Sequence, residues 1–304
     1  MKNWKPKDPI FVRSYAKIHL TYDLLPKDQT SGHPEISTLA QLVDLHDTIC
    51  LRTIPRDTVE LICSAHESDN ETNLAFRAAQ AVRQRFSRAI KSTGIQIEII
   101  KKIPDTAGLG GPQSNAAAVI LGIIRLFHIP ATWRDFFDLA NSIGPDVVFF
   151  LYGVVSQCDR RGEIVTPLKA VWPASMRWIL IVIPSVKGYV SDSIYKDVRD
   201  GHRNQGIHTS AVREALENGK PFCAESLDNC LEVAVLERQG EIRKARDEMI
   251  RAGAQWARLS GKGPALYTIF SSLEDALNVK GKLDGQGYQV FTTRPVNDKE
   301  IAFY

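Results

Sequence analysis

The chain has 304 residues, of which 44% are hydrophobic and 24% are charged, a composition typical of a soluble globular protein. Its formal net charge of +3 is too small, and its basic residues are too scattered, to indicate a nucleic-acid-binding protein. No stretch approaches the ~20 apolar residues of a membrane-spanning helix, and the polar opening residues lack the apolar core of a signal peptide. The five widely spaced cysteines form no C-x-x-C pair, so we expect reduced thiols in a cytoplasmic protein, without zinc or a disulfide framework.

The first half of the chain predicts strands alternating with helices. Period-2 patterns indicate strands over residues 11–22, 47–54, 59–64 and 95–100 and short strands over 153–159 and 163–168. The strands 47–54 and 59–64 are expected to pair through a turn near residues 55–57. Residues 36–45 fit either a strand or a helix, and residues 27–35 form a polar loop. Apolar residues at helical spacing predict helices over 73–90, 115–127 and 132–143.

The second half begins after residues 169–176, which include Pro173 and are the best candidate for a boundary between domains 1–172 and 173–304. Strands are predicted over 178–183, 254–259, 265–270 and 288–293, with a tight turn over 260–264. Helices are predicted over 192–198, 209–218, 224–236, 240–252 and 273–283. This order suits a small antiparallel sheet with helices on one face.

Residues 104–118 form a glycine-rich turn between a predicted strand and a predicted helix. Gly108, Gly110 and Gly111 lack the Cβ atoms that would keep a phosphate away from the backbone. The following helix N-terminus adds about half a positive charge. The segment fits neither a Walker loop nor the dinucleotide fingerprint, which needs a glycine at the position of Gln113. On these residues alone, an ordinary glycine-rich turn remains the alternative to a phosphate-binding loop.

Two charged residues lie within or beside apolar runs. Lys17 is in the middle of the strand predicted over 11–22, where a lysine is usually a solvated edge residue. Asp146 directly precedes the apolar run 147–151, so it is either a helix cap, worth ~1 kcal/mol, or a carboxylate placed at a functional site.

Four segments then occur in a fixed order: Ser14-Tyr-Ala-Lys-Ile-His-Leu20, residues 104–118, Gly144-Pro-Asp-Val-Val-Phe-Phe150 and Ala257-Arg-Leu-Ser-Gly-Lys-Gly-Pro264. In this order they resemble the motifs of the GHMP small-molecule kinases, which include galactokinase, homoserine kinase and mevalonate kinase. Within that superfamily they look most like the 4-diphosphocytidyl-2-C-methyl-D-erythritol kinases. Residues 73–74 and 229–232 resemble two shorter signatures of the same family, so the likeness spans nearly the whole chain.

The resemblance implies an α+β fold with two domains. The first would be similar to the second domain of ribosomal protein S5 and the second would be ferredoxin-like, with the site in the cleft between them. It implies an ATP- and Mg²⁺-dependent kinase that phosphorylates the 2-hydroxyl of 4-diphosphocytidyl-2-C-methyl-D-erythritol in non-mevalonate isoprenoid biosynthesis. The expected partner is this small molecule rather than a nucleic acid or a membrane, and a homodimer is left open.

The resemblance also implies roles for individual residues. Asp146 would take the proton of the substrate hydroxyl, and Lys17 would keep Asp146 ionised and neutralise phosphate charge, as phosphoryl transfer requires. ATP would be bound by Pro104, Gly108, Leu109, Gly110, Gly111, Ser114 and Asn115, with the Ser114 hydroxyl assisting Mg²⁺. The acceptor substrate would be contacted by His19, His33, Ser260, Gly261 and Gly263.

The sequence departs from the family pattern at both expected binding sites. Pro112 and Gln113 replace a glycine and a serine in the loop, which removes one N–H donor. Pro112 is acceptable in a first helical turn, so we expect ATP binding to persist, if more weakly. His19 replaces an asparagine, His33 and Pro34 stand for a tyrosine and a histidine, and Lys262 replaces a small residue. Two alternatives follow: a kinase for another alcohol or sugar phosphate, or a catalytically silent ligand-binding homologue.

Overall fold

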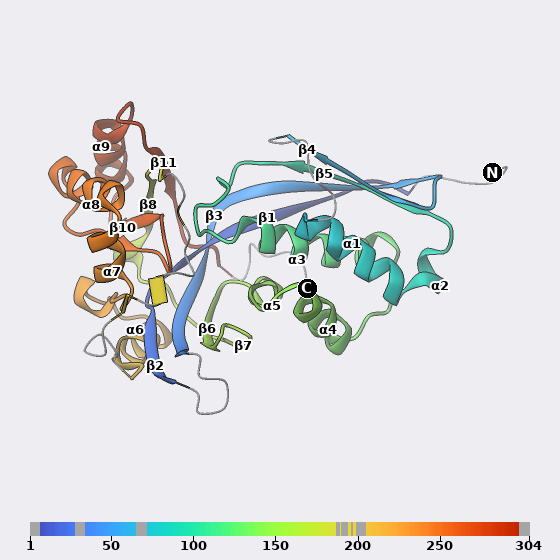
Figure 1. Ribbon diagram of the computed structural model, residues 1–304, viewed down its shortest axis with the longest axis horizontal. Helices are drawn as coiled ribbons and strands as arrows, with labels where there is room; N and C mark the ends of the chain where they lie inside the picture. The colour runs from blue at the N-terminus through green and yellow to red at the C-terminus, as the bar shows by residue number, and fades with distance from the viewer. Residues whose placement is uncertain are drawn as a thin grey trace.

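The structure is a computed structural model that describes residues 7–27, 34–64, 72–186, 189, 194–195, 197–198 and 205–297. Three sequence expectations fall wholly or partly outside this set: His33, residues 28–33 of the polar loop expected over 27–35, and residues 192, 193 and 196 of the helix expected over 192–198. In the described part of the chain the elements build two sheets with helices packed against each (Figure 1). Among these residues, no helix is both long and apolar enough to cross a membrane, and all five cysteines are free thiols.

The larger sheet is organised around one very long strand. Its strands are β1 (Ile10–His19), β2 (Asp23–Lys27), β3 (Pro34–Ile54), β4 (Val59–Cys63), β5 (Gly94–Ile100), β6 (Val155–Arg160) and β7 (Ile164–Pro167). The order is β4-β5-β3-β6-β7, and β1 and β2 also pair with β3. Residues 36–45, which fitted either a strand or a helix, are therefore strand. They are continuous with the strand predicted over 47–54 in the single 21-residue strand β3.

The pairing predicted between strands 47–54 and 59–64 is wrong, because β5 lies between β3 and β4. Gly94 explains why β5 can enter there. A Cβ at Gly94 would lie 1.9 Å from the carbonyl oxygen of Arg56, so only glycine lets the start of β5 pack against the turn after β3. The N–H of Ile95 then donates to the carbonyl of Thr58.

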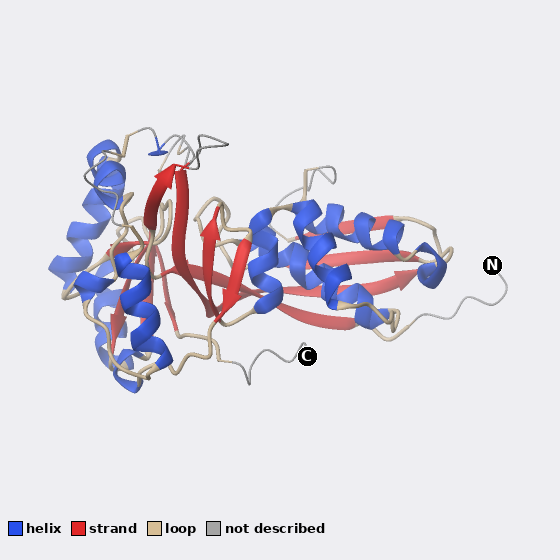
Figure 2. Cartoon of the chain, turned by 90° about the horizontal axis from the view of Figure 1, so that it is seen from below, coloured by secondary structure: helices blue, strands red, loops and turns tan. Residues whose placement is uncertain are grey.

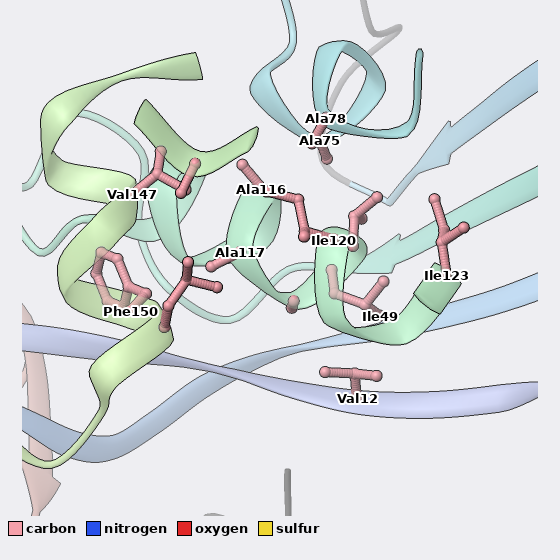
Figure 3. Packing of buried hydrophobic residues seen from close by; sticks show 14 of the residues in the cluster. Val12, Ile49, Ala75, Ala78, Ala116, Ala117, Ile120, Ile123, Val147 and Phe150 are labelled. Atoms are coloured by element: carbon pink, nitrogen blue, oxygen red, sulfur yellow. The ribbon is translucent and has the colours of Figure 1, made fainter. Parts of the chain in front are cut away.

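Helices cover one side of the large sheet (Figures 1 and 2). They are α1 (Leu74–Arg85), α2 (Ser87–Ile90), α3 (Gly111–Leu126), α4 (Trp133–Ile143) and α5 (Pro145–Tyr152). Asn73 caps α1 by accepting from the N–H groups of Ala75 and Phe76, and the helix predicted over 73–90 is interrupted at Phe86. Alanines of α1 and α3 let these helices approach the sheet closely, where Ile49, Ile120 and Phe150 join the same buried cluster (Figure 3).

The smaller sheet contains β8 (Trp178–Ile183), β9 (Arg258–Leu259), β10 (Leu266–Phe270) and β11 (Gln289–Thr293) in the order β11-β8-β10-β9. All of its neighbouring strands are antiparallel. The helices of this half are α6 (Ile207–Glu217), α7 (Glu232–Arg238), α8 (Gly240–Ala252) and α9 (Leu273–Leu283). A β–α–β–β–α–β succession with this strand order is ferredoxin-like, as the resemblance implied.

Two predicted elements of this half are shorter than expected. The helix expected over 224–236 is a 3-10 turn at Ala224–Ser226 followed by α7, and the strand expected over 254–259 is only β9. Asn229 accounts for the first difference. Its amide donates to the carbonyls of Leu259 and Gly261, and its side-chain oxygen accepts from the N–H of Leu231. The chain around Asn229 therefore stays non-helical so that it can hold the loop after β9.

Candidate active site

A cavity of about 520 Å³ lies where the glycine-rich loop, β1, the start of α5 and the loop after β9 meet. The sequence-predicted residues that line it are Lys17, His19, Pro104, Gly108, Leu109, Gly110, Gly111, Asp146 and Gly263. Four further candidates, Ser114, Asn115, Ser260 and Gly261, are not among the lining residues. The structure thus brings together catalytic and loop candidates that are up to 246 positions apart in the sequence, from Lys17 to Gly263.

Lys17 and Asp146 form an ion pair with 3.2 Å between Nζ and Oδ1. Lys17 is only 3% exposed, so the interpretation of a solvated edge lysine is wrong. Its strand is at the sheet edge, but the glycine-rich loop covers this edge, and the Leu109 carbonyl accepts the Lys17 N–H at 2.9 Å. A bulge between Tyr15 and Ala16 directly precedes Lys17 and changes the register there, a feature common beside functional sites.

The carboxylate of the pair faces the cavity. Asp146 lies in the first turn of α5, whose N-cap is Gly144, so Asp146 is not the cap itself. Its side chain is 49% exposed, against 4% for Lys17. The Lys17 ammonium lowers the pKa of the Asp146 carboxyl below its ordinary value, which outweighs the opposing effect of burial. Asp146 is therefore an ionised, accessible base at neutral pH.

The glycine-rich loop makes a close contact with the loop after β9. Gly108 has φ +76°, and a Cβ on it would lie 2.3 Å from the carbonyl oxygen of Gly263. Gly110 is the left-handed N-cap of α3, and a Cβ there would meet the Phe150 ring at 2.7 Å. Helix α3 begins at Gly111, earlier than predicted, so Pro112 lies in the first turn, where its missing N–H removes no intrahelical bond.

Ser114 and Asn115 lie beneath the loop in a buried polar network that also contains Ser14 and Asp47. The Ser14 hydroxyl is within hydrogen-bond distance of Ser114 Oγ, at 2.8 Å, and of Asn115 Oδ1, at 2.6 Å. The Asn115 amide donates to Asp47 at 3.1 Å. None of these four residues lines the cavity, so the contribution of Asn115 is to fix the first turn of α3.

Sequence reasoning missed Asp47, which is fully buried and anchors the start of the loop. Its carboxylate accepts from the N–H groups of Lys102 and Ile103, at 2.7 and 2.8 Å, and from the Lys101 ammonium at 2.8 Å. Together with Asn115, these donors tie both ends of the glycine-rich segment to one side chain of β3. The signal that could have found it is an aspartate at the start of the strand predicted over 47–54, directly before the residues that alternate as a buried strand.

The second loop holds His19 in place. The Ser260 hydroxyl oxygen accepts the N–H of His19 at 3.0 Å, and a Cβ on Gly261 would lie 2.8 Å from the His19 ring. Ser260 and Gly261 therefore support a cavity-lining residue. Lys262 does line the cavity, with its ammonium 5.0 Å from the centre of the Tyr195 ring.

The hydrogen bonds around His19 fix which ring nitrogen carries its proton. The Thr38 hydroxyl donates its single proton to the carbonyl of Thr21 at 2.5 Å. Its oxygen lies 2.9 Å from His19 Nδ1 and must accept there, so Nδ1 is protonated. Burial, assisted by the charge of Lys17, lowers the pKa of His19 to about 3, and the ring is neutral. Nε2 is consequently a hydrogen-bond acceptor in the wall of the cavity.

Several lining residues were not among the sequence candidates, and three of them come from strand β6 and the turn that follows it. Arg161 and Gly162 form the turn between β6 and β7, and Cys158 precedes them on β6. Burial raises the pKa of the Cys158 thiol to about 12, so it lines the cavity as a neutral group. A turn of charged residues and glycine has no distinctive sequence pattern, and only the sheet register brings it to the site.

Comparison with known protein families gives two matches. The model of the GHMP kinases N terminal domain matches residues 73–154, and that of the GHMP kinases C terminal matches residues 209–289. A 4-diphosphocytidyl-2-C-methyl-D-erythritol kinase of Caldicellulosiruptor saccharolyticus is 35% identical over 278 residues, which are 90% of this chain and 92% of the relative. A kinase of the same name from Clostridium perfringens is 29% identical and covers 95% of this chain and 99% of its own.

Solved structures give the same result for the fold. A crystal structure of a 4-(cytidine 5'-diphospho)-2C-methyl-D-erythritol kinase superposes with a TM-score of 0.78 at 25% identity, covering 95% of this chain and all of that one. Homoserine kinase from Cytophaga hutchinsonii superposes with a TM-score of 0.74 at 19% identity, covering 99% of this chain and 98% of that one. The second likeness concerns the fold alone.

Proposed function

This chain belongs to the GHMP kinase family, and from that premise we propose that it transfers the γ-phosphoryl group of ATP to the 2-hydroxyl of 4-diphosphocytidyl-2-C-methyl-D-erythritol. The product would serve non-mevalonate isoprenoid biosynthesis. The phosphate-binding half would span residues 1–172 and the second half 173–304. The free cysteines fit a reducing, cytoplasmic compartment.

The observation that carries this proposal is the Lys17–Asp146 pair in a cavity whose wall is the glycine-rich loop. Phosphoryl transfer asks little covalent chemistry of the protein and depends on positioning and on cations near the phosphates. A buried lysine supplies a fixed positive charge, and an ionised carboxylate beside it can take a proton. Because each charge stabilises the other, both the Lys17 ammonium and the Asp146 carboxylate stay charged in the cavity.

Each residue then has a task. The first turn of α3 and the loop 104–111 bind the ATP phosphates through backbone N–H groups and the positive end of the helix. The acceptor hydroxyl lies at Asp146, which accepts its proton as the new O–P bond forms. Lys17 keeps Asp146 ionised and offsets charge on the transferred group. His19 Nε2 accepts a hydrogen bond from a hydroxyl or amino group of the acceptor.

The proposed Mg²⁺ would be bound mainly by the phosphates of ATP and by water rather than by a cluster of protein side chains. Among the described residues, no group of three or more histidine, cysteine and acidic side chains could hold a metal. Mg²⁺ in kinases is bound largely by substrate phosphates and water, with one or two protein oxygens, so the absence of such a cluster suits it. The Ser114 hydroxyl, which the resemblance implies as the protein ligand, does not fit this role here, because Ser114 is 3% exposed, contacts Ser14 and does not line the cavity. The ion would be held through phosphate and water and would neutralise phosphate charge during transfer.

The test is an assay of ADP formation with four acceptors: 4-diphosphocytidyl-2-C-methyl-D-erythritol, the same alcohol phosphate without cytidine, homoserine and mevalonate. We expect turnover only with the cytidine compound. Turnover with another acceptor and none with the cytidine compound would reassign the substrate within the family. No turnover despite Mg-ATP binding would favour a catalytically silent ligand-binding protein, an idea motivated by Pro112 and Gln113.

A further inference from the structure

The turn between β6 and β7 lies beside the Asp146 carboxylate. Gly162, in this turn, is buried and has φ +102°, and a Cβ on it would lie 3.5 Å from Asp146 Oδ1. Strand β6 pairs with β3 on one side and with β7 on the other, and the hairpin lies beside α5 in Figure 1. The turn is therefore fixed relative to Asp146 by the sheet.

Arg161 immediately precedes Gly162 and lines the cavity. Its backbone N–H donates to the Glu163 carboxylate at 2.8 Å, which holds the turn. Within the described part of the chain, the Arg161 guanidinium has no ion pair or hydrogen bond of its own. Among the other cavity cations, Lys17 is paired with Asp146 and Lys262 lies over Tyr195. Arg161 thus offers an uncommitted, planar set of donors suited to phosphate.

The position of Arg161 indicates which of the two substrates carries the phosphate that Arg161 would contact. The glycine-rich loop contacts the lysine side of the catalytic pair, since Leu109 accepts the Lys17 N–H and Gly110 packs near Lys17 Cε. The β6–β7 turn contacts the aspartate side. ATP phosphates would bind at the loop, so a cation carried by the β6–β7 turn, which contacts Asp146 through Gly162, lies on the side of the molecule whose hydroxyl Asp146 would deprotonate.

We propose that Arg161 is a specificity-determining residue that binds a phosphate group carried by the acceptor alcohol while its hydroxyl lies at Asp146. This inference rests on the proposed function and deepens it. The enzyme selects acceptors that already carry phosphate, and its affinity for a phosphate-free alcohol is low because Arg161 then loses its partner.

Kinetics of Arg161→Met test this role, since methionine keeps the apolar stem and removes the donors. We expect the KM and the calorimetric Kd for the diphosphate acceptor to rise by about tenfold to a hundredfold, the range for a hydrogen bond to a charged group. The KM for ATP should change little. Arg161→Lys should recover part of the loss, because a point charge replaces the planar fork.

Arg160 provides a matched control. It is the adjacent residue and is exposed like Arg161, but it lies at the end of β6 and is not among the cavity-lining residues. Arg160→Met should therefore leave both KM values unchanged. An unchanged acceptor KM in Arg161→Met would overturn the proposal. So would an equal loss in both variants, or a fall in kcat without a change in acceptor KM, which would assign Arg161 to the transferred phosphoryl group.

A second probe separates this proposal from the proposed substrate. If the wild-type protein neither binds nor phosphorylates the cytidine compound, the proposed function fails, and inorganic pyrophosphate then serves as the diphosphate probe. It is titrated calorimetrically in the presence of saturating Mg-ADP, which occupies the glycine-rich loop. Weaker pyrophosphate binding by Arg161→Met than by Arg160→Met would support the Arg161 site, and equal binding would contradict it.

Discussion

At the scale of single residues, the chemistry of the site depends on the protonation states of Asp146 and His19. Asp146 is ionised because a buried ammonium lies 3.2 Å away, and His19 is neutral because it is buried and lies near that same charge. The two side chains therefore present different functions to a bound alcohol. In the proposed reaction Asp146 would accept a proton, whereas His19 would accept only a hydrogen bond.

The His19 tautomer can be tested by nitrogen NMR on protein labelled with ¹⁵N at histidine, with the signal assigned from its loss in His19→Asn. We expect a proton on Nδ1 and none on Nε2 from about pH 5 to about pH 8, because the pKa is lowered to about 3. Since the folded pKa lies below 6.5, protonation on acidification favours the unfolded chain and stability falls below that pH.

Thr38→Val provides the matching perturbation, because it removes the oxygen that accepts from Nδ1. A proton on Nε2 should then become detectable. A wild-type His19 that titrates near pH 6.5, or that carries its proton on Nε2, would contradict the assignment.

At the scale of elements, two glycine-containing loops meet over the cavity, and their contact demands glycine at one point. Gly108 has a left-handed φ of +76°, and its nearest neighbour is a backbone carbonyl, that of Gly263, which has little freedom to move. The hydrogen bond from the Ala265 N–H to the Ala107 carbonyl joins the same two loops.

Gly108→Ala should therefore displace the phosphate-binding loop. The left-handed conformation alone costs alanine about 1–2 kcal/mol, so we expect the KM for ATP to rise by at least about tenfold. Gly281→Ala is the control, because Gly281 is in the interior of α9 and a Cβ there meets nothing within 4 Å. Equal ATP affinity in the two variants would show that the loop contact is not needed.

The elements differ in how far the sequence determines them. Regular patterns located β8, α8 and α9 with the predicted bounds, and β5 within one residue. The continuity of β3 was not predicted, because Asp44, His46 and Asp47 interrupt its apolar alternation. Asp47 is buried only because backbone N–H groups and Lys101 from a distant segment satisfy it, and local sequence does not reveal such partners.

The same distinction holds for the site. Lys17, Asp146 and the glycine-rich loop were predicted because they occur in ordered motifs, and the structure places them around one cavity. Ser114 and Asn115 belong to the same motif but face a buried network. Arg161 was missed because an arginine in a turn is usually solvated, and only the pairing of β6 with β3 brings it to the cavity wall.

At the scale of the whole molecule, the two halves are joined through the strands that carry the site. The Tyr22 N–H donates to the Asp228 carbonyl, and the Tyr267 hydroxyl donates to the Leu20 carbonyl. After β11 the chain returns to the large sheet, where the Val296 N–H donates to the Leu42 carbonyl. The cavity is thus built from both halves, and binding of both substrates depends on how they are held together.

The measurement that tests the central claim most directly is the rate of phosphate transfer from ATP to 4-diphosphocytidyl-2-C-methyl-D-erythritol by the wild-type protein and by Asp146→Asn. Asparagine preserves size and removes the base, so we expect the wild-type protein to form the 2-phosphate and the variant to lose about 10²–10⁴-fold in kcat. The Kd for Mg-ATP should stay similar in both. Equal turnover in the two proteins would contradict the assignment of Asp146 as the base that drives the transfer.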